Sequence, residues 1–300
     1  MNDKILHSSF YRLTPVSDPR ALANQIFLWA DGLVGSLVVA SQGVSGAVAG
    51  TPAAVAHFER ALSESEWLTG VPHQIRFRHS ACKTLPFGRL SVRVKPSLVT
   101  LGLPSMGLLP EPNQDDETHL HPHLWRELMA RSDCVVLDNR NHFEYRLGHF
   151  KGAIDPEVHH FRDFVAFVEA RAPVWRAQAR PVAMYCTGGI RCDLTAPWLR
   201  SLGLEVWQLD GGILNYFETI PTAEADWEGD CFVFDNRIAL NTNLEESSIS
   251  AEAVYDPTFP YERWRLDRAQ QLDRSVQLDR AGDLEEGGDV ISAESDSYRP

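Results

Sequence analysis

A short apolar segment that runs directly into a glycine-containing loop limits the folds open to this chain of 300 residues. Residues Val182 to Tyr185 are apolar without interruption, which predicts a short strand buried on both faces. The loop Cys-Thr-Gly-Gly-Ile-Arg follows at residues 186–191, and a helical pattern runs on to about Leu202. A strand, a tight loop and a helix in this order are typical of an α/β domain with a parallel sheet.

The alternation of strands and helices continues on both sides of this loop. Short apolar strands are predicted at 134–137 and 205–208, and helices at 124–129, 158–170 and from Gly211-Gly212 through 218. Strands joined by helices imply right-handed crossovers within one sheet. We therefore expect residues 118–225 to form a single α/β domain.

The first hundred residues show a different order of elements, strand-helix-strand-strand-helix-strand-strand. The predicted strands are 10–14, 37–40, 47–49, 75–78 and 90–95, the helices run from Ser17 or Asp18 to Trp29 and from Thr51 to Leu62, and a turn is expected at Gly43–Gly46. This order predicts a ferredoxin-like, acylphosphatase-like α+β domain over residues 1–104. Residues 105–117, rich in proline and acidic side chains, are typical of a linker.

Charge divides the chain unevenly. Residues 226–300 carry 7 basic and 18 acidic side chains, a net charge of −11 out of −13 for the chain. We expect residues 226–245 to pack on the core as an extension. Residues 246–300 are acidic and of low complexity, which predicts a disordered tail, with a short docking helix as the alternative.

The N-terminal domain is basic in contrast, with 10 basic and 6 acidic side chains in residues 1–104. Arg76, Arg78, Arg89 and Arg93 fall in a stretch that contains no acidic residue. Such a cluster attracts anionic partners, so these four arginines are candidates for RNA binding. The alternative is a solvated strand face.

The residue types of the loop favour a reactive thiolate. Two glycines let the backbone turn its N–H groups inward, and the following helix adds positive potential at its N-terminus. Together with the charge of Arg191, these groups lower the pKa of the Cys186 thiol, and the same cradle would hold a persulfide. The predicted catalytic residue is Cys186, and the predicted anion cradle is Thr187, Gly188, Gly189, Ile190 and Arg191. The alternative is a buried, inert thiol.

The other cysteines favour structural roles. The five cysteines are odd in number and widely spaced, which indicates a reducing cytoplasm and no disulfide framework. Cys192 follows the loop directly, where it either resolves an oxidised Cys186 or packs in the helix. Cys82, Cys134 and Cys231 lack metal-ligand spacing, so no metal site is expected. No secretory signal is expected, because no apolar stretch with a cleavage site follows the first residues. No apolar run reaches about 18 residues, so no membrane span is expected.

Several motifs resemble the rhodanese domain in order and spacing, namely residues 135–140, 143–145, 148–153 and the Cys186 loop. The catalytic cysteine of that family falls on Cys186 and its loop arginine on Arg191. Asp138 and Arg140 match family positions and are supporting candidates, with scaffold hydrogen bonds as the alternative role. Four residues separate Cys186 from Arg191, whereas the related phosphatase loops have five, so this cradle is sized for sulfur.

The resemblance extends to the bacterial tRNA uridine hydroxylase family, through successive blocks at residues 10–15, 43–46, 99–104, 152–156, 185–192, 209–216 and 227–237. It implies oxygen-dependent formation of 5-hydroxyuridine at the wobble position of tRNA. It also implies binding of the tRNA anticodon region. Neither DNA nor a membrane is expected as a partner, and the sequence leaves the oligomeric state open. Molecular oxygen is the implied co-substrate, and no cofactor motif is evident. Many relatives carry paired cysteines after the last block, but this chain has none after Cys231, so no zinc-stabilised module is expected.

Two other functions remain open from the sequence. The first is a thiosulfate-type sulfurtransferase that forms a persulfide on Cys186. The second is a non-catalytic rhodanese-like binding module, which the presence of Cys186 disfavours. Fold alone does not separate these functions, but the basic N-terminal domain favours RNA.

Overall fold

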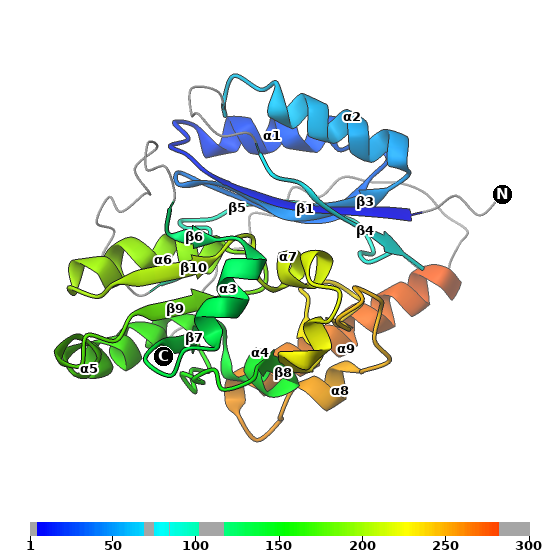
Figure 1. Ribbon diagram of the computed structural model, residues 1–300. Coiled ribbons are helices and arrows are strands. Elements are labelled where there is room, and N and C mark those ends of the chain that lie inside the picture. The colour runs from blue at the N-terminus through cyan, green and yellow to red at the C-terminus, as the bar shows by residue number, and fades with distance from the viewer. Residues whose placement is uncertain (1–4, 69–74, 84, 102–116, 282–300) are drawn as a thin grey trace.

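The computed structural model describes residues 5–68, 75–83, 85–101 and 117–281, with side chains as far as 271. Its N-terminal domain is a five-stranded sheet of order β4-β1-β3-β2-β5, covered on one face by two helices (Figure 1). The elements are β1 (Ile5–Leu13), α1 (Pro19–Trp29), β2 (Val34–Ala40), β3 (Gly43–Gly50), α2 (Pro52–Ser63), β4 (Arg78–Cys82) and β5 (Leu90–Val94). The predicted ferredoxin-like α+β fold is confirmed.

Alternation along β1 gives this sheet two different faces. Phe10 packs into the core beneath the helices, and Ser8 on the same face donates a hydrogen bond to Glu59 of α2 at 2.6 Å. Successive side chains of a strand point to opposite faces, so His7 and Tyr11 face away from the helices. That second face looks towards the rest of the molecule (Figure 1).

Local sequence signals place both helices. Asp18 caps α1 by accepting hydrogen bonds from the backbone of Arg20 and Ala21, and Thr51 caps α2, with a proline in the first turn of each. The turn predicted at Gly43–Gly46 is wrong, because the chain turns at 41–42 and both glycines lie in β3, which begins at Gly43. The strand predicted at 75–78 begins only at Arg78, where pairing with Ser9 of β1 starts.

The second domain is a four-stranded parallel sheet of order β6-β10-β9-β7 with helices on both faces (Figure 1). Its elements are β6 (His119–Leu120), α3 (Pro122–Met129), β7 (Val135–Asp138), α4 (His142–Leu147), β8 (Gly148–Phe150), η1 (Phe161–Asp163), α5 (Phe164–Ala177), β9 (Val182–Tyr185), α6 (Ile190–Ser201), β10 (Val206–Leu209), α7 (Gly212–Thr219) and η2 (Ala223–Ala225). The predicted α/β domain is confirmed, and β9 has the predicted bounds.

One helix of this domain is displaced from its predicted position. The helix expected at 158–170 is α5, which begins at Phe164 and continues to Ala177. Residues 158–160 are not helical, and Pro173 lies inside the helix, where proline removes one backbone hydrogen bond. Burial of Trp175 beyond the proline offsets that loss by extending the apolar face of the helix onto the sheet.

The C-terminal segment packs on the second domain, through β11 (Trp227–Gly229), β12 (Cys231–Phe232), β13 (Ala239–Leu240), α8 (Ala251–Val254) and α9 (Pro260–Ala281). The disorder predicted for residues 246–300 is wrong for the part that the structure describes, 246–281. Val254 and Tyr255 bury against Phe143 and Phe232 despite the acidic composition. Glu262 of α9, wholly buried, accepts a hydrogen bond from Arg146.

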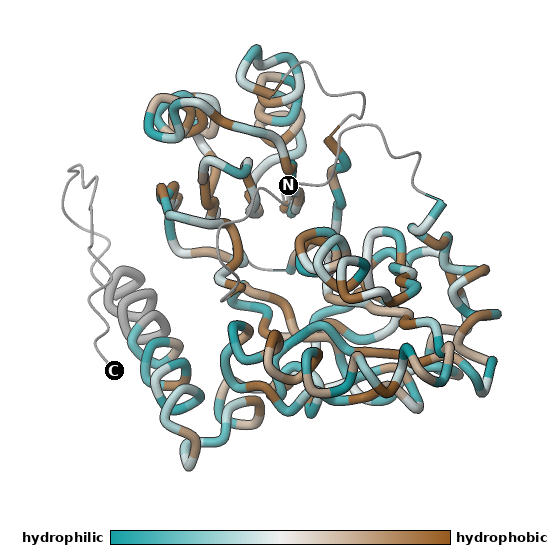
Figure 2. The backbone as a smooth tube through the Cα atoms, turned by 90° about the vertical axis from the view of Figure 1, so that its left-hand side faces the viewer, coloured by the Kyte–Doolittle hydropathy of each residue, from teal (hydrophilic) through white to brown (hydrophobic). Residues whose placement is uncertain are grey.

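From Arg263 to Gln271, α9 is largely hydrophilic, and this part of the helix stands at the side of the molecule (Figure 2). Residues 282–300, the remainder of the predicted tail, lie outside the described residues. Among the described helices, none is both long enough and apolar enough to cross a membrane.

Direct contacts join the two domains. Arg237 of the C-terminal segment donates to Ser80 of β4 at 2.8 Å, and the backbone of Asn236 donates to the carbonyl of Pro86 at 2.9 Å. Glu246 accepts from the backbone of Lys83 at 2.9 Å. The open face of the N-terminal sheet is therefore held against the second domain.

Candidate active site

The loop that follows β9 encloses the sulfur of Cys186. The backbone N–H of Gly189 donates to Cys186 Sγ at 3.1 Å, and the backbone N–H groups of Arg191 and Cys192 also bond to it. Gly189 adopts a φ of +105°, a conformation that favours glycine, and so turns the loop into α6. The predicted cradle thus surrounds the sulfur atom, which is almost wholly buried.

The start of α7 fixes the outer side of this loop. Ile213 and Leu214 donate their backbone N–H groups to the carbonyls of Cys186 and Thr187, at 3.0 and 3.2 Å. A Cβ on Gly212 would lie 2.4 Å from the Cys186 carbonyl oxygen, so only glycine permits this approach. Because α7 engages the carbonyls, the loop N–H groups remain directed at Sγ.

Opposing effects set the ionisation of Cys186. Burial alone would raise its pKa, but hydrogen bonding by the Cys192 side chain, the charge of Arg191 and the backbone N–H groups outweigh burial and lower the pKa to about 6. Cys186 is therefore mostly thiolate at neutral pH. Burial raises the pKa of Cys192, so the two neighbouring thiols differ in reactivity.

Arg191 acts on Cys186 from within a buried ion pair. Its guanidinium donates to both carboxylate oxygens of Glu144 in α4, at 2.7 and 2.8 Å. Burial of Glu144 would raise its pKa, but the charge and hydrogen bonds of Arg191 keep that pKa below its usual value. The pair holds the end of the loop against α4, and a 3.4 Å contact links Arg191 to Thr187.

Asp138 and Arg140 form a second ion pair beneath the sheet edge and do not contact the sulfur. Both are fully buried, joined by hydrogen bonds of 2.8 and 2.6 Å, and Tyr185 donates to Asp138 at 2.7 Å. Arg140 also donates to the carbonyl of Gly148. These contacts tie β7, β8 and β9 together, which is the scaffold role that the sequence left as the alternative.

Asn139 is a positioning residue that sequence reasoning did not single out. Its side-chain amide donates to Thr195 at 2.8 Å and approaches Cys192 Sγ at 3.6 Å. The amide thereby joins the end of β7 to the first turns of α6. Its only sequence signal is its position directly after a buried strand.

A second group that the sequence did not reveal comes from both domains. Tyr11 of β1 donates its hydroxyl to Asp193 of α6 at 2.7 Å, and His119 Nε2 lies 2.7 Å from the other oxygen of the same carboxylate. A Cβ on Gly189 would lie 2.8 Å from the Tyr11 hydroxyl, so this side chain covers the Cys186 loop. Burial and Asp193 raise the pKa of Tyr11, which keeps the hydroxyl protonated. The N-terminal domain thus supplies part of the site.

The four candidate RNA-binding arginines lie in two separate places. Arg78 is on β4 and Arg93 on β5, the two edge strands of the sheet, with Arg76 and Arg89 just before those strands. Arg76 forms an ion pair with Asp210 at 2.6 Å, and both Arg76 and Arg89 are exposed. They do not form the single patch that their spacing suggested.

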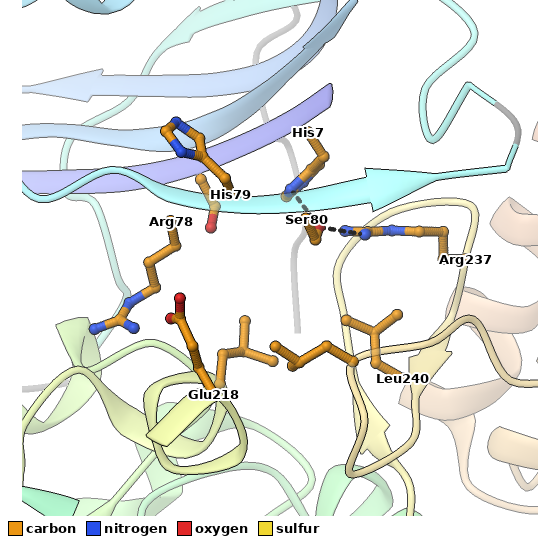
Figure 3. Close-up of a pocket in the computed structure, with 10 residues that line it drawn as sticks. His7, Arg78, His79, Ser80, Glu218, Arg237 and Leu240 are labelled. Carbon is orange, nitrogen blue, oxygen red and sulfur yellow. Dashed lines mark hydrogen bonds between the residues drawn. The ribbon is translucent and has the colours of Figure 1, made fainter. Parts of the chain in front are cut away.

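Arg78 lines a small pocket between the domains (Figure 3). His7, Ser80 and Arg78 line it from the N-terminal sheet, and Glu218 and Leu240 from the other side. Burial and the nearby charge of Arg237 lower the pKa of His7 to about 4, so this histidine is neutral at physiological pH. Among the described residues, no cluster of three or more His, Cys, Asp or Glu side chains is suited to hold a metal ion.

Comparisons with known families agree with this two-domain architecture. Residues 5–98 match the model of the UPF0176 acylphosphatase like domain, and residues 122–219 match that of the rhodanese-like domain. Fold and site together define a rhodanese-type protein with an acylphosphatase-like domain at its N-terminal side.

Full-length relatives narrow the assignment. The tRNA uridine(34) hydroxylase of Nitrobacter winogradskyi is 40% identical over 243 residues, which cover 80% of this chain and 93% of the relative. The tRNA uridine(34) hydroxylases of Deinococcus radiodurans and Synechocystis sp. are 36% and 37% identical to this chain. Each match covers 80% of this chain, and the matches cover 77% and 84% of the respective relatives. The chain belongs to the tRNA uridine(34) hydroxylase family.

Proposed function

We propose that this protein hydroxylates the uridine at position 34 of tRNA to 5-hydroxyuridine, with Cys186 as the reacting group. The observation that carries the proposal is a cysteine with a pKa of about 6, enclosed by backbone N–H groups, in a chain that is 40% identical over 243 residues to a tRNA uridine(34) hydroxylase. The reaction takes place in the cytoplasm, where reducing conditions preserve the thiol.

The proposed chemistry begins with covalent capture of the base. The Cys186 thiolate adds to C6 of the uracil ring, and the electron pair of the C5–C6 double bond moves towards C5 and O4. C5 then becomes electron-rich and takes one oxygen atom from molecular oxygen as co-substrate. The second oxygen atom leaves as water, so an external donor supplies two electrons. Expulsion of Cys186 restores the double bond after the C5 proton leaves.

The need to reach the target uridine favours the anticodon loop as the region of tRNA that binds to the protein. Unpaired bases of RNA loops can be splayed out and presented to a protein site, whereas bases in an RNA helix are hidden. Arg89 and Arg93 at the β5 edge are the proposed phosphate contacts. Arg78, in the pocket between the domains, is the proposed contact nearer the Cys186 loop, since it packs beside Gly211 at the start of α7.

Nucleoside mass spectrometry of tRNA incubated with the protein, oxygen and a reductant tests the reaction. The wild type should form 5-hydroxyuridine and Cys186→Ala should not, because the thiolate is removed. Cys82→Ala, which changes a half-buried cysteine elsewhere, is the matched control and should retain activity. Product formation by Cys186→Ala would disprove the assigned role of the thiolate.

A paired substitution tests the RNA contacts. Arg89→Ala with Arg93→Ala should weaken tRNA binding and flatten the slope of log affinity against log salt by about 1.4 to 1.8 units, at about 0.7 to 0.9 per lost phosphate contact. Arg20→Ala with Arg60→Ala removes the same charge from exposed positions on the helical layer and is the control. Equal slopes for the two double variants would refute contact at the β5 edge.

A further inference from the structure

An exposed aromatic ring stands beside the catalytic loop. Phe234, in the turn between β12 and β13, is 56% exposed, and Arg191 lies over its ring at 5.8 Å from the centroid. Two other aromatic side chains with described positions are equally exposed, Phe27 on α1 and Trp264 on α9. Phe234 is in contact with Arg191 of the Cys186 loop, whereas Trp264 is in contact with Arg268 of its own helix.

Several hydrogen bonds hold the turn that carries Phe234. Val233 donates its backbone N–H to the carbonyl of Ile238 at 2.8 Å, and Arg237 donates through Nε and Nη2 to the two carboxylate oxygens of Asp235. The same Arg237 donates to Ser80, which anchors the turn to the N-terminal domain. These hydrogen bonds hold the backbone that presents the Phe234 ring to solvent.

The surroundings of the ring leave part of it open. Phe232 meets it edge-on, with centroids 4.9 Å apart and planes at 89°, and the Arg191 guanidinium lies over it. Arg191 also lies over the ring of Phe161, at 5.7 Å from its centroid. With more than half of its surface exposed, Phe234 offers a flat apolar surface next to the buried Arg191–Glu144 ion pair.

We propose that Phe234 is a stacking platform for an unpaired nucleobase of the RNA substrate, the neighbour of the base presented to Cys186. This inference rests on the proposed function, which brings a single-stranded RNA loop to the site. Proteins hold unstacked bases of such loops on aromatic side chains, and every base has a face that can stack.

Binding of a fluorescent anticodon stem–loop RNA tests the platform. Phe234→Ala should weaken binding about 5- to 150-fold, the range for loss of one base–aromatic stack. Phe234→Trp should retain affinity, and Phe234→Leu should lose most of it, because leucine is apolar but has no flat face. Phe27→Ala, a control of equal exposure on the helical layer, should bind like the wild type.

RNA variants identify the stacked base. Removing the base on one side of the target uridine should weaken binding to the wild type, and Phe234→Ala should then cause little further loss, since the two changes remove the same contact. Removing the base on the other side should leave the full effect of Phe234→Ala. If both abasic RNAs leave that effect intact, Phe234 does not stack on a neighbouring base.

The outcome separates this inference from the proposed function. Phe234→Ala should keep its melting temperature and its Cys186 alkylation profile, because the ring is exposed and does not contact the sulfur. A wild type that forms no 5-hydroxyuridine would refute the proposed function. An active wild type in which Phe234→Ala binds RNA as well as Phe27→Ala would refute the platform alone.

Discussion

The acidity of Cys186 depends on its neighbour Cys192, which leads to a prediction of defined size. Cys192→Ala removes the side-chain hydrogen bond that is the largest of the effects lowering the Cys186 pKa. A hydrogen bond to a charged group contributes about 1.5 to 3 kcal/mol, and one pKa unit corresponds to about 1.4 kcal/mol. We therefore expect the pKa to rise from about 6 to about 7 or 8.

The rate of alkylation by iodoacetamide as a function of pH measures this change. At pH 6 about half of Cys186 is thiolate in the wild type, and about a tenth or less in Cys192→Ala, so alkylation should slow about 5- to 50-fold. The two rates should converge above pH 9. Cys192→Ser keeps a donor at the same place and is the control. Equal midpoints for the wild type and Cys192→Ala would refute the role of Cys192.

The same assay separates acidity from exposure. Cys82 is more exposed than Cys186, but partial burial raises the pKa of Cys82, so Cys82 should react more slowly than Cys186 at pH 6.

The folded pKa of Cys186 lies below that of an ordinary thiol, so ionisation of Cys186 stabilises the folded state at pH values above the unfolded pKa. That contribution should be lost as the pH falls through about 6.

Two further predictions concern stability and the contact between domains. Removal of residues 246–300 should lower the melting temperature by about 6 to 12 °C, because it takes away at least about 3 kcal/mol of apolar burial around Phe143. Scanning fluorimetry measures this change, and an unchanged melting temperature would contradict the prediction. Tyr11→Phe should lower the free energy of unfolding by about 1 kcal/mol, because it loses the hydrogen bond to Asp193, and it should also slow hydroxylation. Tyr261→Phe in α9 is the control and should hydroxylate at the wild-type rate. Equal rates for the two variants would show that the Tyr11 hydroxyl has no part in the site.

Local patterns in the sequence predict most of the fold. The uninterrupted apolar run at 182–185 gives β9 its bounds, and Asp18 with Pro19 marks the start of α1. Failures arise where long-range contacts override composition. Residues 246–271 are acidic and polar, yet Val254 and Tyr255 find an apolar surface on α4 that no local pattern announces.

The site divides in the same way. The Cys186 loop is predictable, because its glycines, its strand and its arginine are neighbours in sequence. Tyr11 is not, since 182 positions separate it from Asp193 and a tyrosine on a strand carries no signal of its target. The four arginines show the opposite error. Their closeness in sequence suggested one patch, but they lie at opposite edges of one sheet.

The packing of the C-terminal segment on α4 has a consequence for biosynthesis. Glu144, which holds Arg191, sits on α4 next to Phe143, and Phe143 packs on Tyr255. A ribosome makes about 5 to 20 residues per second, so Cys186 is synthesised several seconds before the segment that braces its charge partner. The contact that braces Glu144 is therefore added only after the loop that Glu144 holds through Arg191 has been made.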